Sequence, residues 1–261
     1  MALKDYNKAF RYGKKEYESQ LLAGRKPTLE SLDEVLPDEA LSTESLGLVQ
    51  IPIDQIVGTR YSGRSSAFAS NFMPILESNT EFAIKWAKLS TSHEKEGIHE
   101  PIKAWEYMNK FYVEEGNKRV SVMKFFGAIS IPGTVTRILP KKTNDKNVKV
   151  YYEFVNFYRV SKVNYITFSE EGQYAQLIKE MGKHPDEYWT DDDRLIFSSV
   201  YARFTAAFHA HGGKELEVST AEAFLAFLHL YGYKRVEEMS VEEINELVKK
   251  AWEEFVLLQY N

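Results

Sequence analysis

The sequence predicts an α+β protein in which a small mixed-sheet domain is followed by a helical C-terminal domain. Three observations support this fold class. A strand end, a tight turn and a short helix follow one another at residues 112–127, YVEEGNKRVSVMKFFG. Short β-branched segments separated by turn residues surround that stretch over residues 46–140. Three helix-capping boxes then follow, beginning at Thr190, Ser219 and Ser240.

Residues 1–45 are predicted to form an N-terminal helix and a linker. Aromatic and leucine side chains recur at helical spacing over residues 5–23, and Gly24 ends the pattern. Such a stripe is typical of a helix that packs on a protein body. The acidic, turn-rich segment at residues 37–45 is predicted to be the linker.

Residues 46–140 are predicted to be the mixed-sheet domain. A strand and a turn are expected at residues 46–58, and a loop rich in small polar residues at 59–72. A helix capped by Ser78 should follow, and a hairpin at residues 101–114 should lead into the central turn. The domain should therefore alternate short strands with two helices.

The C-terminal half is predicted to change from extended to helical structure. Two short strands separated by Pro132 and Gly133 should complete the mixed-sheet domain. Residues 141–168 are predicted to be an extended β segment because Tyr, Phe and Val are concentrated there. Residues 169–261 are predicted to be the helical C-terminal domain, in which the last helix runs through residues 240–259.

Composition excludes several classes of function. The chain of 261 residues has no cysteine, so it has no disulfide, thiolate metal site or thiol catalysis. No apolar run approaches about 18 residues and the N-terminus lacks a signal-like apolar segment, which predicts a cytoplasmic protein with no membrane contact. The net charge of −5 argues against nucleic-acid binding, which normally needs a basic face.

The candidate binding site is the turn at Gly116. Glycine permits close backbone approach, and the start of the following helix offers unpaired N–H groups to an anion. Lys118 would supply a point charge, and Arg119, with its head expected in solvent, would grip two phosphate oxygens. On spacing alone, a strand-to-helix turn with two solvated cations explains the same residues.

Two further cations lie in the loop at residues 59–72, where Arg60 and Arg64 flank Gly63. A loop of small polar residues with two arginines suits a segment that closes over an anion, and an ordinary surface loop is the alternative. No metal site is predicted. His209 and His211 are two residues apart, a spacing that points them in different directions on a helix.

Three segments in order resemble the N-terminal domain of the ParB and sulfiredoxin superfamily. They are IPIDQI at residues 51–56, GIHEPI at 97–102 and the central stretch at 112–127, and the resemblance covers about residues 46–139. It implies a small α+β domain that binds nucleotide phosphates, such as CTP in bacterial partition proteins and ATP in sulfiredoxins and free-serine kinases.

The resemblance also implies site residues. Gly116, Asn117, Lys118 and Arg119 would line the phosphate site. Arg60 falls near the position at which partition proteins carry a Pro-Arg pair, although Thr59 stands here in place of the proline. Sulfiredoxin chemistry is excluded because it needs a cysteine.

Two classes of function follow from this resemblance. The first is a nucleotide-binding regulatory or switching protein, in which a homodimer or a protein partner is left open. The second is a phosphotransferase or hydrolase that uses a nucleoside triphosphate with Mg²⁺, and Glu114 or Glu115 as the base; a solvated strand end explains these two residues as well. A DNA-binding or nuclease role is a further alternative, which the acidic last helix opposes.

Overall fold

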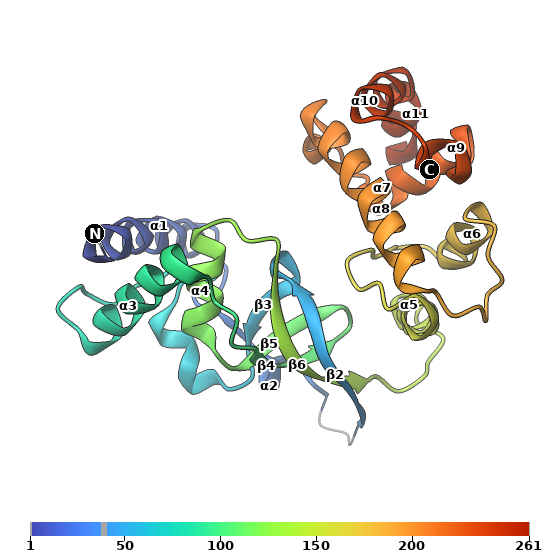
Figure 1. The fold of residues 1–261 in the computed structure, drawn as a ribbon. Helices are drawn as coiled ribbons and strands as arrows, with labels where there is room; N and C mark the ends of the chain where they lie inside the picture. The colour runs from blue at the N-terminus through green and yellow to red at the C-terminus, as the bar shows by residue number, and fades with distance from the viewer. Residues whose placement is uncertain (1, 38–40, 261) are drawn as a thin grey trace. The chain divides into compact units, whose positions relative to one another are not determined.

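The computed structural model describes residues 2–37 and 41–260, except for the side chains of Ala2 and Arg64 (Figure 1). The chain divides into two compact units, residues 1–141 and 142–261. The first contains a six-stranded mixed sheet with helices, and the second is helical over its described residues. The predicted combination of a mixed sheet with many helices is therefore confirmed.

The sheet of the N-terminal unit has the strand order β1-β3-β5-β4-β6-β2. Strands β1, β3 and β5 run parallel, β4 is antiparallel to β5 and parallel to β6, and β2 is antiparallel to β6. The predicted hairpin is confirmed as β4 and β5. The strand bounds are β1 Glu30–Ser31, β2 Ser42–Pro52, β3 Ile56–Thr59, β4 Ile102–Tyr107, β5 Lys110–Glu115 and β6 Ser130–Leu139.

Two long helices of this unit pack through buried aromatic rings. Tyr6 of α1 and Trp86 of α3 are both inaccessible to solvent, and their ring centroids lie 5.6 Å apart. The Trp86 indole also donates a hydrogen bond of 2.8 Å to Ser121 Oγ on α4. The N-terminal aromatic stripe thus docks on the body, as predicted. The helices are α1 Ala2–Leu22, α2 Leu32–Val35, α3 Glu81–Glu96 and α4 Asn117–Phe125, with 3₁₀ turns η1 Ile53–Gln55 and η2 Ser62–Ala67.

Three local predictions in this unit are wrong. Helix α3 is capped by Thr80, whose hydroxyl accepts from the Ala83 N–H at 3.3 Å, because Thr80 directly precedes the first helical residue and Ser78 does not. Residues 42–45 of the expected linker belong to β2, since they pair with β6. The two short strands expected around Pro132 are one strand, β6. Pro132 is accommodated because β4 pairing begins only at the next residue.

The C-terminal unit consists of helices over its described residues. The extended β segment predicted for residues 141–168 is wrong, because residues 146–161 form α5. Asp145 caps this helix by accepting from the N–H groups of Asn147 and Val148. The aromatic side chains lie on one helical face with buried Tyr151, Phe154 and Tyr158, so packing decided against strand propensity. The other helices are α6 Gln173–Glu180, α7 Asp191–Ala210, α8 Thr220–Tyr231, α9 Tyr233–Glu237, α10 Val241–Lys250 and α11 Trp252–Leu257, with 3₁₀ turns η3 Gly213–Glu215 and η4 Leu258–Tyr260.

The three predicted capping boxes of this unit are confirmed. In each box the capping hydroxyl accepts a hydrogen bond from the backbone N–H of the third helical residue. The acidic side chain of that residue accepts a hydrogen bond from the backbone N–H of the capping residue. The capping residues are Thr190, Ser219 and Ser240. The single last helix that was expected is interrupted at Ala251, between α10 and α11. Across the described part of the chain, no helix combines the length and apolarity that a membrane span requires.

Candidate functional site

The turn at Gly116 joins β5 to α4 in a conformation that favours glycine. Its φ is 113°, and an added Cβ would lie 2.6 Å from Ile102 Cγ2 and 3.3 Å from Arg119 Nε. Glycine has no side chain that could cap α4, which begins at Asn117. The first N–H groups of α4 and its positive dipole end therefore lie at a turn that supplies no capping side chain, which is an arrangement that can bind an anion.

The carboxyl ends of β3 and β5 lie side by side at this turn. The two strands are parallel, with Thr59 opposite Val113. The Arg60 N–H and the Thr59 hydroxyl both donate to the Val113 carbonyl, at 2.8 and 3.0 Å. Ligands commonly bind beyond the carboxyl ends of parallel strands. The sheet therefore brings Arg60 to the same edge as the Gly116 turn.

Asn117 is largely buried at the start of α4, with 8% of its surface exposed. Its Nδ2 donates to Thr59 Oγ1 at 3.3 Å, which places the amide between the end of β3 and the start of α4. Thr59 gives its own proton to Val113, so it accepts from Asn117, and Asn117 Oδ1 is left without a hydrogen-bond partner among the described residues. A buried acceptor in this state costs roughly 1–3 kcal/mol.

Arg60 is held against the edge of the sheet by an ion pair and by two aromatic rings. Its Nη1 contacts Asp33 Oδ1, and its Cζ lies 5.1 Å from the Tyr61 ring centroid and 5.3 Å from that of Trp105. Its Nε is buried and has no acceptor within the part of the chain that is described. The Trp105 indole in turn donates to Glu114. Arg60 thus belongs to a cluster that also contains one of the predicted acids.

The expectation that the Arg119 side chain extends into solvent is wrong. Its side chain is 13% exposed, and Nη1 donates to the carbonyl oxygens of Glu100 and Pro101 at 2.9 and 2.7 Å. The loop before β4 packs on the first turn of α4 and offers these acceptors, which local spacing cannot reveal. Lys118 lies over the Phe82 ring, with Nζ 4.8 Å from its centroid.

Glu114 and Glu115 point to different partners, as alternation along a strand predicts. Glu114 is half-buried and accepts from Trp105, whereas Glu115 is exposed and pairs with Lys103 Nζ at 2.8 Å. The hydrogen bond with the Glu115 carboxylate raises the pKa of Lys103 above its usual value. The two acids therefore do not form a carboxylate pair.

Three other residues considered in the sequence are Arg64, His209 and His211. The backbone of Arg64 lies in η2, but its side chain falls outside the described residues. In the described ranges, no group of three or more His, Asp or Glu side chains is placed to hold a metal ion. His209 and His211 diverge: the first bonds Thr220 at 3.1 Å and the second Asn245 at 3.2 Å.

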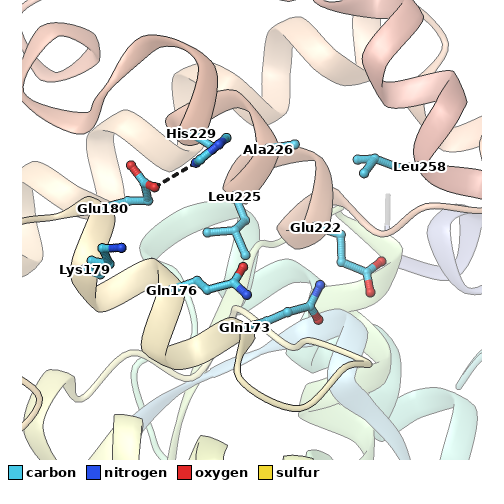
Figure 2. A pocket seen from close by; sticks show the side chains of 9 residues that line it. All are labelled: Gln173, Gln176, Lys179, Glu180, Glu222, Leu225, Ala226, His229 and Leu258. Atoms are coloured by element: carbon cyan, nitrogen blue, oxygen red, sulfur yellow. Dashed lines mark hydrogen bonds and ion pairs between the residues drawn. The ribbon is translucent and has the colours of Figure 1, made fainter. Parts of the chain in front are cut away.

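A separate groove of about 500 Å³ lies within the C-terminal unit (Figure 2). An ion pair of 3.1 Å between Glu180 Oε1 and His229 Nδ1 links α6 to α8 at its rim, and His229 is exposed. The groove has no local sequence signal, because Glu180 and His229 are 49 residues apart in the chain. It is lined by Gln173, Gln176, Lys179, Glu180, Glu222, Leu225, Ala226, His229 and Leu258.

No protein-family model matches the chain, and no curated protein is found to match it. The geometry of the two sites is therefore the basis for assigning a function. The turn at Gly116 combines helix N–H groups and arginines with polar atoms that have no partner among the described residues. Both carboxylates of the groove already accept hydrogen bonds, Glu180 from His229 and Glu222 from Ser169 and Ser219. The turn is the stronger candidate.

Proposed function

We propose that the protein binds the phosphates of a nucleotide at the Gly116 turn and acts as a regulatory or switching protein. The observation that supports this function best is the start of α4, which has no capping side chain and lies at the shared edge of β3 and β5. The proposed relationship is to the nucleotide-binding N-terminal domain of the ParB and sulfiredoxin superfamily, whose three quoted segments all fall in the N-terminal unit.

The two arginines at this edge can supply further donors to an anion. Arg119 makes its contacts to Glu100 and Pro101 through Nη1, and a guanidinium carries five N–H donors in all. Arg60 lies at the same edge, and its buried Nε has no acceptor among the described residues. On this proposal the phosphates bind the N–H groups of α4, and Mg²⁺ enters with the nucleotide because its phosphates provide most of the ligands.

Arg119 suggests how binding would be transmitted. Its guanidinium lies beside Gly116 and holds the loop at residues 100–101. A phosphate at the turn would compete with these carbonyls for Arg119, because a charge-assisted hydrogen bond is stronger than a neutral one. The loop would then be held less firmly in the bound state than in the free state. Nucleotide binding would therefore favour conformations in which Arg119 has released the loop.

The structure favours binding over phosphotransfer at this site. Glu114 accepts from Trp105 and Glu115 pairs with Lys103, so each candidate base is engaged by a protein donor. A general base must reach the proton that it removes. We therefore do not propose catalysis, and the acidic net charge of −5 likewise gives no support to a DNA-binding role.

A thermal-shift screen tests the proposed function. The full chain is heated with ATP, ADP, CTP, GTP or UTP, each with and without Mg²⁺, and with tripolyphosphate. A ligand at a hundred times its dissociation constant adds about 2.7 kcal/mol of stability, so the melting temperature should rise. No rise with any of these ligands would refute the proposal.

A matched pair of charge reversals locates the site. Lys118→Glu places a negative charge in the first turn of α4, where acids stabilise a helix but repel phosphate. Lys88→Glu makes the same charge change at an exposed position of α3. The shift should disappear in the first variant and persist in the second. Equal shifts in both variants would place the ligand elsewhere.

A further inference from the structure

We propose that the exposed ring of Tyr61 is a stacking platform for the base of the nucleotide. The platform rests on the nucleotide-binding function proposed above and adds the residue that would hold the base. Recognition of phosphates alone would accept any polyphosphate. A platform for a flat ring beside the phosphate site would select a nucleotide.

Tyr61 is an exposed aromatic residue that follows the end of β3. Its exposed fraction is 46%. Burying the apolar face of an aromatic ring is favourable, so a ligand that covers the ring would gain binding free energy. The Arg60 guanidinium lies over the ring, with Cζ 5.1 Å from the centroid, and also over Trp105 at 5.3 Å. Arg60 thus contacts the Tyr61 ring while nearly half of the surface of Tyr61 remains exposed.

The register of the sheet brings Tyr61 near the phosphate-binding turn. Thr59 and Val113 are opposite each other on parallel strands. Tyr61 follows Thr59 by two residues, and Gly116 follows Val113 by three. Both therefore leave the sheet at the same edge and at similar heights, because each residue of a strand advances about 3.3 Å and adjacent strands lie about 4.8 Å apart.

A buried polar group lies between the end of β3 and the start of α4. The amide of Asn117 bridges the end of β3 and the start of α4 through its bond to Thr59. Asn117 is more than nine-tenths buried, and within the described ranges its Oδ1 accepts no hydrogen bond. An acceptor at this position suits a ligand that carries hydroxyl or amino donors as well as phosphates. A nucleotide has both, whereas inorganic polyphosphate has neither a ribose hydroxyl nor a base amino group.

Stacking would not identify the base, because every base has a π-face. Removing an aromatic platform weakens binding by roughly 10- to 100-fold per stacked base. Tripolyphosphate has no ring, so its affinity should not depend on Tyr61. The comparison between the two ligands therefore separates stacking from any effect on the phosphate site.

Calorimetric titration of the full chain tests the platform. ATP, CTP, GTP and UTP with Mg²⁺, and tripolyphosphate, are titrated into the wild type and three variants. Tyr61→Leu keeps an apolar side chain but removes the ring, Tyr61→Phe keeps the ring, and Tyr188→Leu makes the same change at an exposed tyrosine of the C-terminal unit. Melting temperatures are measured in parallel to show that each variant is folded.

The expected result is a loss of about 10- to 100-fold in nucleotide affinity for Tyr61→Leu alone. Its tripolyphosphate affinity should stay at the wild-type value. Unchanged nucleotide binding in Tyr61→Leu would overturn the platform and leave the phosphate site standing. Equal weakening of nucleotide and tripolyphosphate would overturn it too, because Tyr61 would then act by holding Arg60. Binding of neither ligand by the wild type would refute both the platform and the proposed function.

Discussion

Replacing Arg137 should destabilise the N-terminal unit strongly, because Arg137 is a buried cation in the middle of the sheet. Its side chain is 2% exposed and contacts Glu106, which is 1% exposed, on the neighbouring strand β4. Nη1 also lies 3.1 Å from Glu44 on β2. One face of three adjacent strands thus carries a row of alternating charges.

The magnitude follows from which charge is left behind. Arg137→Met leaves the buried Glu106 carboxylate without Arg137, and losing one member of a buried pair costs about 3–5 kcal/mol. Adding Glu106→Gln removes that charge and keeps an acceptor for the Asn109 N–H, which donates to Glu106 Oε1 at 2.8 Å. The double variant should regain most of the lost stability, since a buried pair often contributes little net free energy.

Urea unfolding followed by circular dichroism measures these changes in the full chain. Glu44→Gln is the control, because the Glu44 side chain is 43% exposed and Arg137 keeps its buried partner Glu106 in this variant, so the loss of stability should be smaller. A double-mutant cycle of Arg137→Met and Glu106→Gln gives the coupling energy. If Arg137→Met costs no more than the Glu44 control, or if the double variant regains nothing, the argument from buried charge is refuted.

Three further predictions concern the turn, a helix cap and a buried hydroxyl. Gly116→Ala should lower the free energy of unfolding by about 1–3 kcal/mol because of its positive φ, and a wild-type melting curve would contradict this. Ser240→Ala should cost about 0.5–2 kcal/mol by removing the cap of α10, whereas Ser240→Asp should retain it in the same urea titration. Burial raises the pKa of Tyr165 from 10.0 to about 12. The neutral phenol therefore stabilises the fold up to pH 10, and this contribution is lost as the pH rises towards 12. Tyr165→Phe should lose less stability than the wild type above pH 10, because it has no buried phenol to ionise, and an identical pH profile would contradict this.

The parts of the fold that could be predicted from sequence are those fixed by neighbouring residues. Thr190, Ser219 and Ser240 cap their helices because the reciprocal acid is three residues away. The strand, turn and helix around Gly116 are equally local. The prediction of an extended segment is wrong at α5 although Asp145 offers a helix cap, because Val, Tyr and Phe favour strands locally whereas the helical spacing of the buried side chains decides the structure.

The candidate site was harder to predict because its contacts are distant in sequence. Arg60 meets Asp33 and Trp105 only because β1, β3, β5 and β4 are neighbours in the sheet. Arg119 binds the carbonyls of Glu100 and Pro101, which lie in the second of the segments used to recognise the resemblance. The spacing of residues in the sequence therefore indicates the candidate residues. The sheet topology decides which of their hydrogen-bond donors already have protein acceptors.

The pairing of β2 with β6 has a consequence for how the chain folds. Ser42 lies opposite Leu139, so the longest ladder of the sheet joins residues almost a hundred positions apart. Contacts at such separations form slowly, because a long loop must close before the pairing stabilises it. A growing chain that has not yet reached Ser130 would leave β2 and one edge of β4 unpaired. Unpaired edges can associate with other chains, and the pairing of β6 covers the edge of β4 and one edge of β2, which becomes the last strand of the sheet.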